Sequence, residues 1–330
     1  MCENRLKISM PKIFLMWIFV GFRWPSWAPR GEYEHFDSIR RLASWIPQSG
    51  FPSLFKLMNG QVYVPIINKA ELNKEQKWPL LVFSHGLGCA RFTYSQICYN
   101  LASFGFIVIA PEHRDGSACL SFSIDKAGQK WTVPHRRIEF NEDEYFIRNR
   151  QVRERAYEAT QALELGLTLN SKPEELKGFG FGGDFDWGTF VDAIDVSKPI
   201  MTGHSFGGAT TLLAMHSDPR FKAGIVLDGW LFPLRDMKNL NLDNRSVMFV
   251  NAESFLNEEN LQKMQNFQEN QDKTANDAKR TCHYIQGSVH QNYIDAPFVI
   301  RVSLYTLSEN LKLCPKIQFA EKLKIVNLTL

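Results

Sequence analysis

Short apolar runs alternate with longer stretches of helical spacing from residue 78 to about residue 300 of this chain. The run "PLLVFSHG", residues 79–86, is apolar and ends in small residues, as expected for a strand buried on both faces of a sheet. The next stretch, "TYSQICYNLASFG", has helical spacing and ends at Gly105, a residue suited to the end of a helix. Further strands are expected in "FIVIA", "KPIMTGHS", "AGIVLD", "SVMFVNAES" and "CHYIQGSVH", and further helices near 144–170, in "ATTLLAMHS" and within 257–279. This alternation predicts an α/β fold with a mostly parallel central sheet flanked by helices on both faces.

The 330 residues can form one large α/β domain, because a chain of this length can bury a large core. Residues 78–300 carry the alternating pattern and are expected to form that core. We expect residues 1–77 to be an N-terminal extension that packs on the core, with "QVYVPI" as a candidate edge strand. Residues 301–330 are expected to be an atypical C-terminal tail. The sequence contains no repeats and no strong linker, so we expect one domain.

The composition argues against several classes of protein. Hydrophobic residues make up 44% of the chain and charged residues 22%, which indicates a folded globular protein. The net charge of +3 is too small to imply a nucleic-acid partner, and the arginines of "RNRQVRERAYEAT" are mixed with acids, as on a solvated helix face. The six cysteines are far apart and form no C-x-x-C pair, so we expect free thiols and no zinc site.

The N-terminal segment bears on the location of the protein. Arg5, Lys7 and Lys12 precede an apolar run at residues 13–22, which has the charge and length of the hydrophobic part of a signal peptide. The residues that follow offer no convincing cleavage site, and the run is too short for a transmembrane helix. Cys2 stands where an N-myristoylation signal needs glycine. We therefore favour a cytoplasmic or membrane-associated protein, with secretion as the alternative.

The stretch "GHSFGGAT", residues 203–210, places Ser205 between two glycines with the spacing G-x-S-x-G. In a nucleophile elbow the serine lies on a sharp turn from a strand to a helix, so the residues around it must be small. Gly203 and Gly207 fill those positions, and the helix that follows would direct free N–H groups toward a developing oxyanion. The alternative is a glycine turn with an inert serine, and the motif alone leaves both interpretations open.

Partners for Ser205 decide between these interpretations, because a serine hydroxyl needs a base and the base needs an acid that orients it. In α/β-hydrolases the serine, acid and histidine follow one another along the chain, each after a strand. Asp228 ends the run "AGIVLD", and His290 is the only histidine after the last expected strand. Glu253, after "SVMFVNA", is a rival acid, but the loop position favours Asp228. The predicted catalytic residues are Ser205, Asp228 and His290.

The oxyanion hole is expected to consist of two backbone N–H groups. One belongs to Phe206, next to the serine, and the other to Leu87, in the turn "SHGLG" after the first core strand. His204 would point away from the serine hydroxyl, so we expect it to have a packing role. His113, in "EHRDG", is expected to belong to a hydrogen-bonded loop framework rather than a metal site, since no third ligand accompanies it and Asp115.

Several stretches of the chain resemble a known family, the platelet-activating factor acetylhydrolases of the plasma and intracellular type II branch. These stretches are "PLLVFSHGLG", "YSQICYNLASFGFIVIAPEHRDGSA", "IRNRQVRERAYEATQAL", "GHSFGGAT", "RFKAGIVLDGWLFPL" and "GSVHQN". Two of their segments, "LDGWLFPL" and "GSVHQN", are not general hydrolase motifs. The resemblance spans about two-thirds of the chain. It implies an α/β-hydrolase fold and places the family's acid and base on Asp228 and His290.

The resemblance also implies a function in lipid catabolism. It implies a calcium-independent serine esterase that removes the sn-2 acetyl group, or a short or oxidised acyl chain, from a glycerophosphocholine. Such an enzyme takes a phospholipid substrate at a membrane or lipoprotein surface and uses no metal or cofactor. Trp230, Leu231 and Phe232 follow the acid, where they could line an acyl pocket, and core packing is the alternative. Hydrolysis of another ester, a thioester or a peptide stays open, as does lipid binding by a catalytically inactive relative.

Both ends of the chain depart from the family pattern. The residues before "WIPQSGF" are short of the extra strands that the family places there, and we find no resemblance after about residue 300. The three predicted catalytic residues all lie between these two ends.

Overall fold

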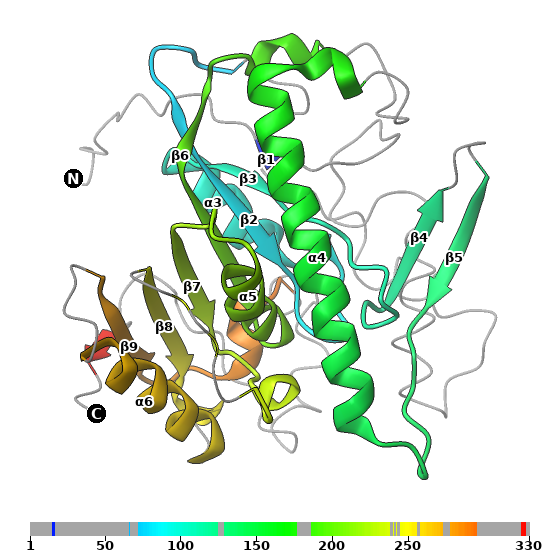
Figure 1. Cartoon of the computed structure of the whole chain (residues 1–330), viewed down its shortest axis with the longest axis vertical. Helices are drawn as coiled ribbons and strands as arrows, with labels where there is room; N and C mark the ends of the chain where they lie inside the picture. The colour runs from blue at the N-terminus through cyan, green and yellow to red at the C-terminus, as the bar shows by residue number, and fades with distance from the viewer. Residues whose placement is uncertain are drawn as a thin grey trace, which may run out of the picture.

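The centre of the structure is a sheet of eight strands in the order β1-β3-β2-β6-β7-β8-β9-β10. The computed structural model describes residues 15–16, 66, 72–124, 129–176, 186–237, 240, 242, 245–255, 258–272, 278–295 and 325–327. Neighbouring strands in this sheet are parallel, except that β9 and β10 are antiparallel. The prediction of a mostly parallel central sheet is therefore confirmed (Figure 1).

Each strand that the apolar runs predict is present in this sheet. Its strands are β1 (Leu15–Met16), β2 (Trp78–Ser84), β3 (Ile107–Ile109), β6 (Ile194–His204), β7 (Ala223–Leu227), β8 (Ser246–Ala252), β9 (Arg280–Ile285) and β10 (Ile325–Asn327). The strands β1 and β10 are not among the predicted strands, and neither is a separate antiparallel pair, β4 (Leu120–Ile124) and β5 (Lys130–Pro134). The segments of β4 and β5 lack the continuous apolar pattern of the strands in the main sheet.

Helices cover both faces of the sheet. Along β2, Leu80 and Val82 point into one hydrophobic cluster, while Leu81 and Phe83 point into another, because successive side chains of a strand face opposite ways. The first cluster includes residues of α4 and α5, and the second includes a residue of α3 (Figure 1). The helices are α3 (Ser95–Ser103), α4 (Glu144–Ser171), α5 (Phe206–Ser217) and α6 (Glu258–Asp272). The predicted arrangement of helices on both faces is confirmed.

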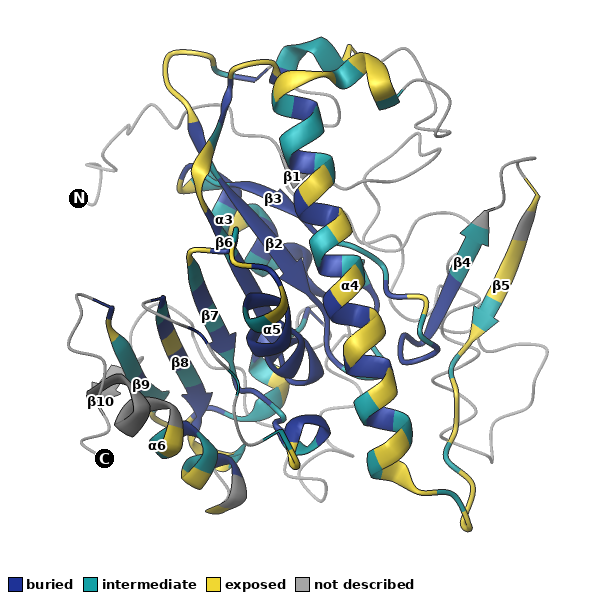
Figure 2. Ribbon diagram, in the orientation of Figure 1, coloured by how far each residue is buried: buried dark blue, intermediate teal, exposed yellow. Residues whose placement is uncertain are grey.

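The long helix α4 agrees with the helix predicted near 144–170, and the side chain of Asp143 caps its first turn. The interpretation of its arginines as a solvated face is wrong for two of them. Arg148 and Arg155 are buried together with small and apolar residues of α4. Figure 2 shows that the buried side of α4 faces the sheet and α5. The two arginines lie on the same face because they are about two turns apart.

The remaining predictions concern the two ends of the chain and the cysteines. The segments "QVYVPI" and "WIPQSGF" lie outside the described residues, apart from Ile66, and the division into extension, core and tail stays a prediction. No helix in the described part of the chain is both long and apolar enough to cross a bilayer. The cysteines Cys89, Cys98, Cys119 and Cys282 are free thiols, as predicted.

Candidate active site

Ser205 occupies the sharp turn between β6 and α5. Its φ of 57° and ψ of −117° lie outside the regions that residues with a side chain usually adopt. Backbone hydrogen bonds fix the turn: the Ser205 N–H donates to the carbonyl of Leu227 at 3.0 Å, and the Ser205 carbonyl accepts from the N–H of Trp230 at 2.9 Å. A strained serine between a parallel strand and a helix has the geometry of a nucleophile elbow.

The two glycines around Ser205 are required by close contacts between backbones. A Cβ atom on Gly203 would overlap the carbonyl oxygen of Gly207, and one on Gly207 would overlap the carbonyl oxygen of Ser84 at the end of β2. No side chain fits at either position without moving the backbone. The spacing G-x-S-x-G therefore follows from how closely the start of α5 packs on β2 and β6.

The side chain of Asp228, directly after β7, bonds to His290. Its Oδ2 accepts a hydrogen bond from Nδ1 of His290 at 2.6 Å, and its Oδ1 accepts one from the N–H of Ala252 at 2.8 Å. Because the carboxylate holds the proton on Nδ1, Nε2 of His290 is left able to accept a proton. The structure thus brings Asp228 and His290 into contact, as the order along the chain predicts, and their roles as acid and base stay a prediction.

Asp228 is a buried carboxyl group in direct contact with the imidazole of His290. The residue is 1% exposed, and burial raises the pKa of its carboxyl group, while the hydrogen bond from His290 lowers it. Water screens a buried carboxylate poorly, so its attraction for an adjacent cation is stronger than at the surface. Asp228 is therefore placed to stabilise His290 when the imidazole takes up a proton.

Two aromatic rings pack against the imidazole of His290. The ring of Phe255 stacks on it with centroids 3.9 Å apart, and the ring of His204 lies 4.4 Å away. Nδ1 of His204 is 2.8 Å from the hydroxyl of Tyr94, and burial lowers the pKa of His204 well below its ordinary value. His204 thus has the packing role that its position predicts, whereas Phe255 and Tyr94 carry no sequence signal that we recognised.

The same region contains the one cluster of candidate metal ligands found among the described residues. Single ligand atoms of His204, Asp228 and His290 lie within 4.8 Å of one another. However, Asp228 and His290 bond to each other, and Nδ1 of His204 bonds to Tyr94. The direct bond between Asp228 and His290 is the contact that an acid–base pair needs, while Nε2 of His204 is buried without a hydrogen-bond partner.

The two predicted oxyanion donors lie close to Ser205. Phe206 is the first residue of α5, so its N–H has no carbonyl partner within the helix. Leu87 lies in the loop after β2, and that loop passes next to the serine, because a Cβ atom on Gly86 would lie 3.3 Å from Cβ of Ser205. Neither N–H donates a backbone hydrogen bond within the described part of the chain. Their role in binding an oxyanion stays a prediction.

The rival acid, Glu253, occupies a different position from Asp228. It is exposed in the turn after β8, and its Oε2 accepts a hydrogen bond from the N–H of Gly287 at 2.6 Å. Glu253 therefore supports the backbone of the loop that leads to His290, whereas Asp228 holds the imidazole itself.

The three residues predicted to line a substrate pocket differ in their surroundings. Leu231 is fully buried and belongs to the hydrophobic core. Trp230 and Phe232 are half-buried and stack on each other with centroids 5.6 Å apart, and Trp230 meets the ring of Phe206 edge-on at 5.5 Å. Leu231 thus packs in the core, while a pocket role for Trp230 and Phe232 stays a prediction.

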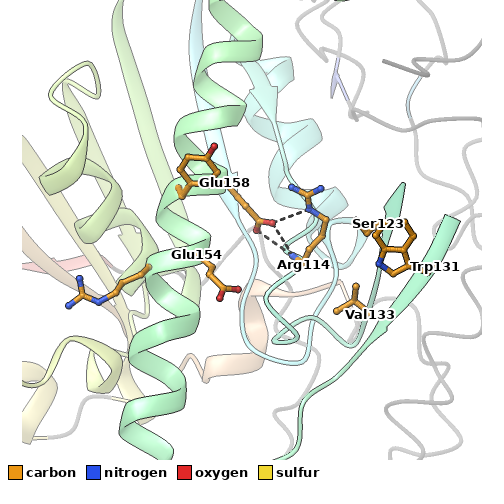
Figure 3. A pocket seen from close by; sticks show the side chains of 8 residues that line it. Arg114, Ser123, Trp131, Val133, Glu154 and Glu158 are labelled. Atoms are coloured by element: carbon orange, nitrogen blue, oxygen red, sulfur yellow. Dashed lines mark hydrogen bonds and ion pairs between the residues drawn. The ribbon is translucent and has the colours of Figure 1, made fainter. Parts of the chain in front are cut away.

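A hydrogen-bonded framework joins the loop that contains His113 to α4. Nε2 of His113 lies 2.7 Å from Oγ of Ser84, and its Nδ1 lies 2.8 Å from Oε2 of Glu158. Figure 3 shows Glu158 reaching from α4 to Arg114, whose backbone N–H and Nε both donate to the carboxylate. Asp115 pairs instead with a buried arginine of α4. This is the loop framework predicted for His113.

Comparison with known proteins identifies relatives over most of the chain. The sequence matches the family described as platelet-activating factor acetylhydrolase, isoform II, over residues 21–327, so both ends resemble the family further than the sequence motifs predict. The chain is 36% identical over 258 residues to the platelet-activating factor acetylhydrolase of Gallus gallus, covering 74% of this chain and 59% of that protein. It is 37% identical over 289 residues to that of Canis lupus familiaris, covering 82% and 62%.

The chain spans about three fifths of the length of these two relatives. Among solved structures, a ferulic acid esterase from Streptomyces cinnamoneus has a TM-score of 0.50 and 22% identity, covering 75% of this chain and 64% of that chain. This likeness concerns the fold alone and supports the α/β-hydrolase assignment. Because the match to the family covers residues 21–327, the chain belongs to the platelet-activating factor acetylhydrolase, isoform II, family.

Proposed function

We propose that this chain is a serine esterase in which Ser205 is the nucleophile, His290 the base and Asp228 the acid. The observation that carries the proposal is the 2.6 Å hydrogen bond between His290 and Asp228. The ring of His290 lies 4.4 Å from that of His204, the residue before the strained turn of Ser205. A serine, a histidine and a buried carboxylate in this order and geometry are the groups that acyl transfer requires.

In the first step, Oγ of Ser205 attacks the ester carbonyl carbon while Nε2 of His290 takes the hydroxyl proton. The electron pair of the carbonyl π bond moves to oxygen, and the N–H groups of Leu87 and Phe206 stabilise the resulting oxyanion. The pair then re-forms the carbonyl, the bond to the glycerol oxygen breaks, and His290 gives its proton to the leaving alkoxide.

Water completes the reaction by the same route. His290 takes a proton from water, the hydroxide adds to the acyl carbon, and Oγ of Ser205 leaves and recovers the proton. The products are a lysophospholipid and a carboxylic acid, which is present as its carboxylate at neutral pH. No step in this sequence uses a metal or a redox cofactor.

The substrate class rests on the relatives, which are named platelet-activating factor acetylhydrolases. By that likeness, the substrate is a glycerophosphocholine with an acetyl group, or a short or oxidised acyl chain, at the sn-2 position. Contact with a membrane or lipoprotein surface is part of the same proposal. Trp230 and Phe232 are the candidate walls of the acyl pocket, because Trp230 contacts the ring of Phe206.

A panel of substrates tests the proposal. Hydrolysis rates are compared for 1-alkyl-2-acetyl-glycerophosphocholine, a long-chain diacyl phosphocholine, a water-soluble acetate ester and a peptide, with Ser205→Ala as the control. We expect the acetyl phospholipid to be hydrolysed faster than the long-chain lipid, and the control to be inactive. Hydrolysis of the water-soluble ester alone would indicate a different esterase. A folded protein that binds phospholipid and hydrolyses nothing would be an inactive relative.

A further inference from the structure

Arg155 places a positive charge in the interior of the protein, on the inner face of α4. It is 0% exposed and is among the largest fully buried side chains of the described residues. Burying a guanidinium group is costly unless every donor finds a partner. The partners of Arg155 therefore indicate which parts of the structure this side chain holds in place.

The first set of partners holds the loop that contains Leu87. One terminal nitrogen of Arg155 donates to the carbonyl of His85 at 2.6 Å. Its Nε donates to Oγ of Ser117 at 2.7 Å, and the carbonyl of Ser117 accepts from the N–H of Gly88 at 2.8 Å. The loop is thus held on both sides of Leu87, directly through His85 and indirectly through Gly88.

The second contact reaches the other predicted oxyanion donor. The guanidinium carbon of Arg155 lies over the ring of Phe206, 4.4 Å from its centroid. Cation–π contacts of this kind are stronger away from water, and both side chains here are fully buried. One side chain therefore contacts the loop of Leu87 and the residue Phe206.

Asp115 balances the buried charge. Its Oδ2 lies 3.1 Å from Nε of Arg155, and both side chains are 0% exposed. The planar guanidinium can donate to a carbonyl and a carboxylate with its edges while a ring stacks on its face, which a lysine ammonium cannot do. The arrangement thus requires arginine and not merely a positive charge.

We propose that Arg155 is a positioning residue that sets the separation between the N–H groups of Leu87 and Phe206, and so shapes the oxyanion hole. This inference rests on the proposed ester hydrolysis through Ser205. Donors stabilise an oxyanion only when they lie within hydrogen-bond distance of the place where the charge develops. Because the two donors come from different elements, a link between those elements is what fixes their spacing.

Two variants test this role, together with a matched control. Arg155→Lys keeps a charge opposite Asp115 but loses the fork and the stacking surface. Asp115→Asn with Arg155→Met removes both charges and leaves no buried ion unpaired. Arg148→Lys is the control, because Arg148 is also buried on α4 but bonds to Gln151 and Glu144 instead of the loop of Leu87.

The first readouts are kcat and KM for p-nitrophenyl acetate. Circular dichroism gives the folded fraction of each variant, and kcat is calculated per folded molecule. The second readout is the inhibition constant of a trifluoromethyl ketone. The ketone forms a tetrahedral adduct with an oxyanion, so its affinity reports the oxyanion hole. We expect the double variant to lose about 10²-fold in kcat, as on removal of one oxyanion donor, with KM nearly unchanged. In the double variant, the affinity for the ketone should fall by the same factor as kcat. Arg155→Lys should lose less of both kcat and ketone affinity. Arg148→Lys should keep both at the level of the unaltered protein.

Unchanged kcat and ketone affinity in folded Arg155 variants would overturn the positioning role alone. A loss of activity that only follows the folded fraction would also overturn it, since Arg155 would then serve stability. If the unaltered protein hydrolyses no ester, the proposed function fails first, and the role of Arg155 fails with it.

Discussion

Nδ1 of His290 lies 2.6 Å from Oδ2 of Asp228, although 62 residues separate the two in the chain. The contact arises because Asp228 follows β7 and His290 follows β9, and the carboxyl ends of parallel strands meet at one edge of a sheet. Ser205 follows β6 at the same edge. This edge therefore carries all three groups of the proposed reaction.

Removal of the Ser205 hydroxyl should abolish turnover and leave the fold intact. Ser205→Ala is expected to lower kcat by about 10⁶-fold, because no other group can form the acyl-enzyme. Ser205→Gly should be equally inactive but more stable than Ser205→Ala by about 1 kcal/mol, since glycine adopts the positive φ of this turn without strain. Esterase kinetics and urea denaturation measure the two effects. Equal stability of the two variants would show that the turn stores no strain.

The two candidate acids should respond differently to loss of charge. Asp228→Asn is expected to lower kcat by about 10⁴-fold, because the amide neither fixes the tautomer of His290 nor stabilises its protonated form. Glu253→Gln is the matched control and should retain kcat, since Glu253 accepts its hydrogen bond from the backbone of Gly287, in the loop before His290. The reverse pattern of kcat values would make Glu253 the acid.

The glycines around Ser205 should not tolerate a side chain. Gly203→Ala and Gly207→Ala are each expected to lower the free energy of unfolding by about 3 kcal/mol or more, because the added Cβ overlaps a backbone carbonyl. Gly287→Ala is the control: its φ of 72° is strained for alanine, but the space around it is open, so a loss of about 1 kcal/mol is expected. Similar losses at all three positions, measured by urea denaturation, would contradict this packing argument.

Stability should fall as the pH drops below about 6.5, because burial lowers the pKa of both His113 and His204 well below the ordinary value of 6.5. Below pH 6.5 these histidines bind protons in the unfolded chain but stay neutral in the folded protein, so acid favours unfolding. Each histidine should contribute a slope of about 1.4 kcal/mol per pH unit in this window. Urea denaturation at a series of pH values gives the free energy of unfolding, and its dependence on pH gives the slope. His204→Gln should reduce the slope, because residue 204 then takes up no proton in the unfolded chain. A flat profile in the unaltered protein would contradict the account.

Much of the sheet and the contact between Asp228 and His290 could be predicted from the sequence. The strands β2 and β3 are almost wholly buried, so they read as continuous apolar runs, and β2 illustrates this with a run from Trp78 to Ser84. Asp228 and His290 follow such runs in the order that this fold requires. The ends of strands can be read from the local sequence. Because parallel strands end at one edge of the sheet, residues that follow two such strands come close together.

Arg155 could not be predicted in this way, because its neighbours along the chain suggest a solvated helix. Arg153 and Glu154 are exposed, yet the inner face of α4 includes Arg148, Gln151 and Arg155 beside apolar residues. A polar residue on a buried face is explained only by its partners, and those of Arg155 lie far away in the chain, in two loops and at the start of α5. Only the helical period of the small residues around it could have signalled its burial.

The central claim is that Ser205 is an activated nucleophile, and covalent capture tests it most directly. The folded protein is treated with a fluorophosphonate, with and without the acetyl phospholipid, and the modified peptide is mapped by mass spectrometry. Capture requires a serine whose hydroxyl is activated by a base. The account predicts one adduct, on Ser205, that forms more slowly in the presence of the phospholipid. No adduct on the folded protein, or an adduct on another residue, would contradict it.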